Sequence, residues 1–141
     1  MKLTSIIFLF FLLNVRADDF VPKTNFYKAK VLRVHDGDTI YVDMNLISNL
    51  RLNVGCRFLG VAAPELSEVN GKEARKIVES FIKEGDEVII EYVKDDKFAG
   101  RIDSKIWLFD KINNKYFCLN DELLKNKSIF AGMDKNGKKI K

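Results

Sequence analysis

Two short stretches within the first third of the chain, residues 28–34 and 39–44, mix apolar and polar positions and are rich in residues that favour strands. This pattern predicts two β-strands. The polar segment His35–Asp38 lies between them, and we expect its Gly37 to adopt the positive φ that tight reversals often need. The pattern therefore predicts a hairpin with an acidic turn.

A third alternating run covers residues 50–61. Cys56 and Phe58 share one face of this run, whereas Arg57 lies on the other face and is expected to point to solvent. Pro64 ends the strand, because proline cannot donate a hydrogen bond to a strand ladder.

The pattern changes to a helical period over residues 71–84, and Gly85 ends this element. The apolar positions of the helix are Ala74, Ile77, Val78, Phe81 and Ile82. The remaining predicted elements are strands at 87–93, 102–110 and 116–119, and a short helix at 120–125. Asn120 is a candidate cap for that helix. Trp107 and Phe109 lie in an apolar strand, where we expect them to pack in the core.

Strands in this order, with one main helix and a short C-terminal helix, predict an α+β, mainly β domain. The five-stranded barrel of the OB-fold is the architecture that fits best. The predicted organisation is a signal peptide at 1–17, a polar leader at 18–26, the barrel domain at 27–132 and a basic, mobile tail at 133–141.

Residues 1–17 have the pattern of a secretory signal rather than of the folded domain. Lys2 precedes an apolar run over residues 3–13, and Val15–Ala17 is a plausible cleavage site. A membrane span needs about 20 apolar residues, and Arg16 follows too early for that. We therefore expect export to the periplasm, the medium or the cell surface, without stable membrane association after cleavage. An uncleaved N-terminal anchor is the alternative.

The charge of the chain argues only weakly for a polyanionic partner. The sequence holds 24 Lys and Arg against 20 Asp and Glu, a net charge of +4. Lys2 and Arg16 belong to the predicted signal, which has no acidic residue, so 22 basic and 20 acidic residues remain, or +2. Any basic binding surface must therefore be local. Cys56 and Cys118 form one disulfide or remain two free thiols, and the sequence leaves both open.

Five charged residues beside predicted strand ends have the chemistry that phosphodiester cleavage needs: Asp36, Asp38, Arg57, Glu65 and Arg101. Carboxylates hold a hard cation or activate water, and guanidinium groups neutralise charge on the phosphoryl oxygens. Each residue alone also has a structural explanation. Asp-Gly-Asp is a common turn, Glu after Pro is favourable near a helix start, and Gly-Arg in a charged loop is common on surfaces.

In combination, these residues resemble the staphylococcal nuclease (thermonuclease) family, whose OB-fold domain cleaves DNA and RNA with calcium. The resemblance covers about residues 28–124. The family's Asp-Gly-Asp-Thr is present at residues 36–39, and its Arg-Leu-x-x-(Val/Ile)-Asp-(Thr/Ala)-Pro-Glu resembles residues 57–65. The family's Asp-Lys-Tyr-Gly-Arg resembles residues 96–101, which hold one extra residue. Its Asn-Glu-x-Leu resembles residues 120–123.

The resemblance implies a role for each matched position. It makes Asp38 and the carbonyl of Ala63 ligands of a calcium ion. It also makes Arg57 and Arg101 the catalytic arginines and Glu65 the residue that orients or deprotonates the attacking water.

Three departures from the family pattern change this expectation. Ala62 stands where the family has a second calcium-ligating aspartate, so calcium is expected to bind weakly. Phe98 lies near the family's tyrosine position and lacks the hydroxyl. The family's final helix and its nucleotide-binding tyrosines have no clear counterparts in residues 129–141.

The sequence thus predicts an exported, monomeric, metal-dependent nuclease whose substrate is DNA, RNA or both. The alternative is a catalytically impaired OB module that binds nucleic acid or a protein partner. A carbohydrate-binding barrel is a third hypothesis that rests on the fold alone.

Overall fold

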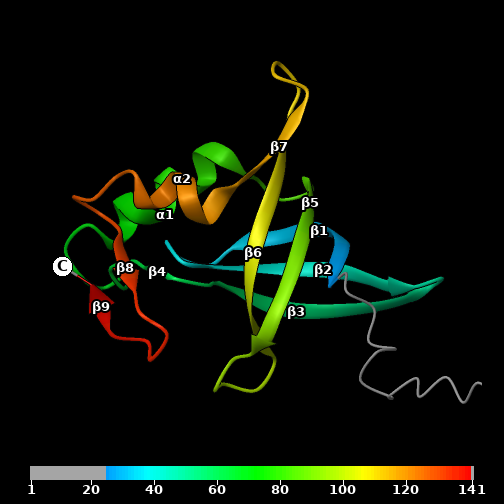
Figure 1. The fold of residues 1–141 in the computed structure, drawn as a ribbon, viewed down its shortest axis with the longest axis horizontal. Helices are drawn as coiled ribbons and strands as arrows, with labels where there is room; N and C mark the ends of the chain where they lie inside the picture. Colours follow the sequence, from blue (N-terminus) through cyan, green and yellow to red (C-terminus); the bar gives the residue numbers. More distant parts are fainter. Residues whose placement is uncertain (1–24, 141) are drawn as a thin grey trace, which may run out of the picture.

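The computed structural model of the chain describes residues 25–140, so the predicted signal peptide lies outside the described residues. Figure 1 shows the arrangement of the elements. The strands are β1 (Phe26–Val34), β2 (Thr39–Ile47), β3 (Leu50–Phe58), β4 (Val61–Ala62), β5 (Glu87–Asp95), β6 (Arg101–Asp110), β7 (Lys115–Cys118), β8 (Ala131–Met133) and β9 (Lys139–Ile140). The helices are α1 (Gly71–Phe81) and α2 (Leu119–Leu124). Neither helix in this range is long and apolar enough to cross a bilayer.

Five strands close into a barrel. The strands of the large sheet lie in the order β3-β2-β1-β5-β6-β7, and β3 also pairs with β6 in parallel, which closes β1, β2, β3, β5 and β6 into a barrel and leaves β7 paired only with β6. Alternate residues point inward, as in β6, where Ile106 and Leu108 are buried. The predicted mainly β architecture with a five-stranded barrel is confirmed, and it is consistent with an OB-like fold.

The predicted third strand is wrong in its extent, because the chain forms two strands there. β3 ends at Phe58, and Gly60 adopts a φ of 77°, which turns the chain away from the barrel. β4 then pairs with β8, and β8 pairs with β9, so these three short strands form a separate sheet. In Figure 1 this sheet and both helices lie at the same end of the barrel. Strand β9 belongs to the segment that the sequence predicts to be a mobile tail.

Helix α1 ends at Phe81, three residues earlier than predicted. Ile82 is extended, with φ −138° and ψ 146°, and its side chain is buried in the core. Lys83 then donates its backbone N–H to the carboxylate of Asp86 in the turn that leads to β5. Leaving the helix at Phe81 therefore allows Ile82 to pack in the core, and burying this side chain stabilises the fold more than further helical residues would.

Asn120 does not cap α2 as predicted, since Cys118 holds the cap position and no side chain caps the helix. The buried Asn120 amide instead connects distant backbone groups. Its oxygen accepts the N–H of Ile106 at 3.0 Å, and its nitrogen donates to the carbonyls of Leu59 and Ser104 at 3.0 and 3.1 Å. Asn120 thus fixes α2 to β6 and to the segment between β3 and β4.

Trp107 and Phe109 do not pack in the core as predicted. Their neighbours Ile106 and Leu108 fill the barrel, so the alternation of the strand turns both rings to the outer face. Phe109 is 46% exposed, and the indole N–H of Trp107 donates to Glu91 at 2.8 Å. Apolar residues on both faces of one strand hide which face is inside.

Cys56 and Cys118 are both buried and form no disulfide. Burial raises the pKa of the Cys56 thiol to about 12, so this cysteine behaves as a small apolar core residue.

Candidate functional site

The acidic turn between β1 and β2 is packed tightly against the rest of the site. The Asp36 carboxylate accepts the backbone N–H of Asp38 at 3.0 Å, which fixes the direction of the turn. Gly37 does not adopt the predicted positive φ. A Cβ at Gly37 would lie 2.6 Å from the Cβ atoms of both Ala63 and Ala74. Glycine is therefore required here because the turn closely approaches α1 and the segment after β4, and not because of its backbone angle.

This close approach brings the Asp38 carboxylate into contact with β3 and the segment after β4. Oδ1 accepts a hydrogen bond from the Thr39 hydroxyl at 3.0 Å and lies 3.3 Å from Nη1 of Arg57. Oδ2 accepts the backbone N–H of Ala63 at 3.1 Å. Burial raises the pKa of Asp38 above its usual range, while the Arg57 guanidinium opposes this shift and Asp36 adds to it. Two predicted site residues, Asp38 and Arg57, thus meet, and Ala63 joins them through its backbone N–H, whereas the predicted ligand is its carbonyl.

Arg57 does not point freely into solvent as its strand position alone predicts. It lies opposite Thr39 in the β2–β3 ladder, which aims its side chain at Asp38. Nη2 also lies 3.4 Å from the sulfur of Met133 in β8, and the side chain is 24% exposed. The small second sheet therefore covers one side of Arg57 and holds it half-buried.

Arg101 begins β6 and lies beside Gly55 of β3. A Cβ at Gly55 would lie 2.9 Å from Cγ of Arg101, so glycine lets the arginine lie flat across β3. Oδ2 of Asp96 accepts a hydrogen bond from Nε of Arg101 at 2.7 Å and forms an ion pair with Nη2 at 2.6 Å, and the centre of the Phe98 ring lies 4.6 Å from the guanidinium carbon. The turn that precedes β6 thus holds Arg101 from two sides.

The parallel pairing of β3 and β6 places the two arginines near each other. Gly55 is opposite Arg101, and Arg57 is opposite Asp103. Arg57 and Arg101 are therefore one strand apart and two residues along, which puts their Cα atoms about 8 Å from each other. The strand residues next to each arginine are buried, so the side chains of Arg57 and Arg101 both point outward from the same surface of the barrel.

Glu65 lies two residues beyond Ala63, in the loop that leads to α1, and its side chain is exposed. Its backbone is held firmly. The N–H donates to the carboxylate of Glu68 at 2.9 Å, and the carbonyl accepts the N–H of Glu68. A Cβ at Gly71 would lie only 1.9 Å from the Glu65 carbonyl oxygen, so the start of α1 packs directly on this loop. The carboxylate of Glu65 makes no hydrogen bond or ion pair with residues 25–140.

Asp103 is a site residue that the sequence reasoning missed. It lies opposite Arg57 on β6, with a carboxylate oxygen 3.7 Å from Nζ of Lys94. Burial raises the pKa of Asp103 and Asp96 adds to this, whereas Lys94, Arg57 and Arg101 lower it. Its spacing of two from Arg101 is the signal that would have placed it on the same face of the strand.

The residues present fit a calcium ion only in part. Calcium takes six to eight oxygen ligands and gains affinity from each carboxylate. Asp38 supplies one carboxylate whose two oxygens already accept hydrogen bonds, and Ala62 supplies no side-chain oxygen next to it. Within the part of the chain that the structure describes, no three His, Cys, Asp or Glu side chains are grouped as metal ligands.

No protein-family model matches this chain, and no curated protein matches it.

Proposed function

We propose that this chain is an exported nuclease that hydrolyses phosphodiester bonds of DNA, RNA or both. The barrel of β1, β2, β3, β5 and β6 is assigned to the OB-fold, and the resemblance to the staphylococcal nuclease family motivates the activity. The single observation that carries the proposal is the pairing of β3 with β6. It brings Arg57 and Arg101 to one surface, beside Asp38.

The two arginines have donors left for a phosphate after their internal contacts. A guanidinium has five N–H donors. Two nitrogens of Arg57 contact Asp38 and Met133, and two nitrogens of Arg101 contact Asp96. A phosphodiester between them is contacted from both sides, and charge that grows on its oxygens in the transition state strengthens both contacts. The acids Asp38 and Asp96 hold each guanidinium in place before substrate arrives.

In this proposal Glu65 accepts a proton from the attacking water as its oxygen bonds to phosphorus. The P–O bond to the leaving sugar oxygen breaks, and solvent water supplies a proton to that oxygen. The Glu65 carboxylate is exposed and free of partners among residues 25–140, while its backbone is anchored on Glu68 and Gly71. A base of this kind contributes about 10²- to 10⁴-fold to the rate. Asp38 and the carbonyl of Ala63 would hold a divalent cation, and such an ion would supply further charge stabilisation.

The second candidate function is a non-catalytic OB module that binds nucleic acid or a protein partner. Ala62 and the fully hydrogen-bonded Asp38 carboxylate favour it, because they leave the cation with few ligands.

One assay separates these functions. The purified protein is incubated with labelled single-stranded DNA and RNA, in millimolar calcium and in chelator. The nuclease proposal predicts cleavage that the chelator abolishes. Binding without cleavage in calcium supports the second function.

A further inference from the structure

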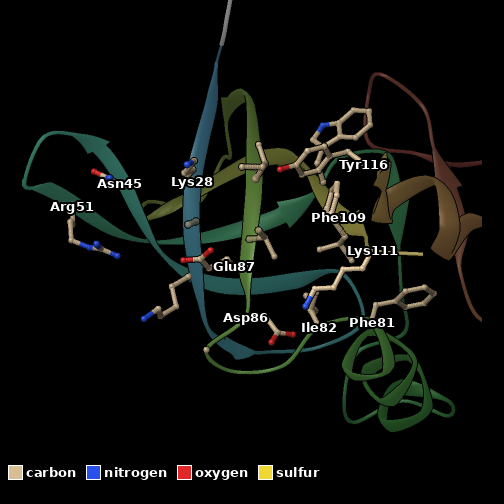
Figure 2. Close-up of a pocket in the computed structure, with 17 residues that line it drawn as sticks. Lys28, Asn45, Arg51, Phe81, Ile82, Asp86, Glu87, Phe109, Lys111 and Tyr116 are labelled. Carbon is tan, nitrogen blue, oxygen red and sulfur yellow. The ribbon is translucent and has the colours of Figure 1, made fainter. Parts of the chain in front are cut away.

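A groove about 830 Å³ in volume lies on the outer surface of β1, β5, β6 and β7, away from the acidic turn and both catalytic arginines. Figure 2 shows Phe109, Tyr116 and Lys111 close together at one side of it, and Lys28 toward the other. The strand ladders explain this grouping. Ile89 pairs with Trp107 and with Lys28, and Phe109 pairs with Tyr116, so these side chains form adjacent rows on one face of the sheet.

The aromatic side of the groove is preformed. The ring centroids of Phe109 and Tyr116 lie 5.1 Å apart, the ring planes are tilted by 58°, and each residue is about half exposed. The hydrogen bond to Glu91 fixes the Trp107 ring beside them. Aromatic rings of this size normally bury their faces in a core, and here they offer open faces for stacking.

The charges around these rings favour an anionic ligand. Lys28, Lys30 and Lys111 line the groove, are exposed, and form no ion pair among the described residues. Asp86 and Glu87 are the acids that line it, and the Asp86 carboxylate already accepts the N–H of Lys83. Arg51, also in the lining, is neutralised by Asp43 at 2.8 Å. A neutral sugar would leave the three lysines without partners.

We propose that this groove binds single-stranded nucleic acid, with unpaired bases stacked on Phe109 and Tyr116 and phosphates contacted by Lys111 and Lys28. Stacking on aromatic rings beside a basic track is the usual way in which proteins hold single strands. The proposal extends the proposed function, because the substrate is the same class of polymer.

Strand β6 links the groove to the candidate site. The outward positions of β6 are Arg101, Asp103, Lys105, Trp107 and Phe109. At about 3.3 Å per residue, Trp107 lies at most about 20 Å from Arg101. This equals roughly six nucleotides at the 3.4 Å spacing of a stacked strand. A nucleic-acid strand that is bound at Arg101 thus reaches the aromatic side of the groove.

The test is a binding measurement in chelator, where no metal-dependent cleavage occurs. Fluorescence anisotropy measures the Kd of the full chain for labelled (dT)20 and for a 20-base-pair duplex. Phe109→Ser is expected to weaken binding of (dT)20 about tenfold and to leave duplex binding unchanged, because duplex bases are already stacked. Val69→Ser, a change at an 85% exposed apolar residue outside the groove, is the matched control.

Lys111→Glu tests the phosphate contact independently of any effect that the Phe109→Ser substitution has on β6. It is expected to weaken (dT)20 binding and to reduce the slope of log K against log salt by about 0.7. Lys127→Glu makes the same charge change outside the groove and is expected to have a smaller effect. Circular dichroism confirms the fold of each variant.

Unchanged (dT)20 binding in Phe109→Ser, equal weakening of single strand and duplex, or equal effects of Lys111→Glu and Lys127→Glu would each overturn the groove assignment. These outcomes leave the proposed hydrolysis untouched. Conversely, a protein that binds (dT)20 through the groove but cleaves nothing in calcium removes the proposed hydrolysis alone.

Discussion

The guanidinium of Arg57 in β3 lies 3.3 Å from the carboxylate of Asp38, in the turn that directly precedes β2. This contact joins a residue proposed to hold a cation to one proposed to hold a phosphate. A bound cation and Arg57 would therefore compete for the Asp38 carboxylate. Additional carboxylates near Asp38 would strengthen cation binding in this competition.

Replacing Ala62 by Asp is expected to strengthen calcium binding. Ala62 is 5% exposed and precedes Ala63, whose N–H contacts Asp38, so the new carboxylate enters beside the first. A ligand that binds only the folded protein raises its stability with concentration. We expect calcium to raise the Tm of Ala62→Asp more than that of the wild type. In chelator the variant is expected to melt lower, because a buried charge is then uncompensated. Equal calcium shifts in both proteins would mean that the cation does not bind beside position 62.

Asp38 gives the protein a characteristic dependence of stability on pH. Its pKa is raised in the folded state, so the folded protein binds this proton more tightly than the unfolded chain does. The Asp38 contribution to the free energy of unfolding is thus greatest below the unfolded pKa and declines as pH rises through the folded pKa. Asp38→Asn lacks this decline.

The check is urea unfolding of both proteins across the acid range. The wild-type stability minus that of Asp38→Asn should fall with rising pH and then stay constant. A difference that grows with pH would contradict the dominance of burial over the Arg57 contact.

Gly71 is expected to tolerate no side chain. A Cβ there meets the Glu65 carbonyl at 1.9 Å, and both partners are backbone, so neither can turn aside. Gly71→Ala should destabilise the protein by about 3 kcal/mol and disturb the Glu65 loop. Gly132→Ala is the control, since its nearest atom is 4.0 Å away, and it should change stability by less than about 0.5 kcal/mol. Denaturant unfolding measures both, and a mild effect of Gly71→Ala would show that the α1 start is looser than described.

Asn120 is expected to matter for stability despite its polar side chain. Asn120→Ala leaves the N–H of Ile106 and the carbonyls of Leu59 and Ser104 without their partner, at a cost of about 3 kcal/mol. Asn113→Ala, at an exposed turn, should cost far less. Similar urea midpoints for the two variants would rule out the connecting role of Asn120.

Arg101 is expected to be irreplaceable by lysine. Lysine keeps the charge but loses the paired contacts of the guanidinium with Asp96 and with a phosphate. Arg101→Lys should lower kcat by about 10²- to 10³-fold while leaving the Tm near that of the wild type. Arg75→Lys breaks a comparable exposed contact with Glu79 on α1 and should leave kcat unchanged. Equal kcat values for these two variants would remove Arg101 from the catalytic group.

The sequence predicted those features that depend on local pattern. Runs of β-forming residues predicted β1, β2, β5 and β6, and the alternation around Arg57 placed it on the outer face of β3. What it missed depends on contacts between distant segments. Glycine is required at position 37 because Ala63 and Ala74 lie close to it, and the Asn120 side chain is held by backbone groups of β6.

The outward rings of Trp107 and Phe109 were missed for a related reason. Residues 106–109 are apolar at every position, so this run alone does not show which face is inside; the charged residues Arg101, Asp103 and Lys105 have the parity of Trp107 and Phe109 and were the overlooked signal. The contact of Arg57 with Met133 likewise depends on the second sheet, whose short strands carry too little pattern to be predicted.

The most direct test of the proposed hydrolysis compares Glu65→Gln with Glu84→Gln, an exposed glutamate with no ion pair among the described residues. Single-turnover cleavage of labelled single-stranded DNA and RNA in millimolar calcium is the measurement. The proposal predicts that Glu65→Gln lowers the rate by about 10²- to 10⁴-fold, and that Glu84→Gln keeps the wild-type rate. A folded wild-type protein that cuts neither substrate, or a Glu65→Gln variant that cuts both at the wild-type rate, would contradict it.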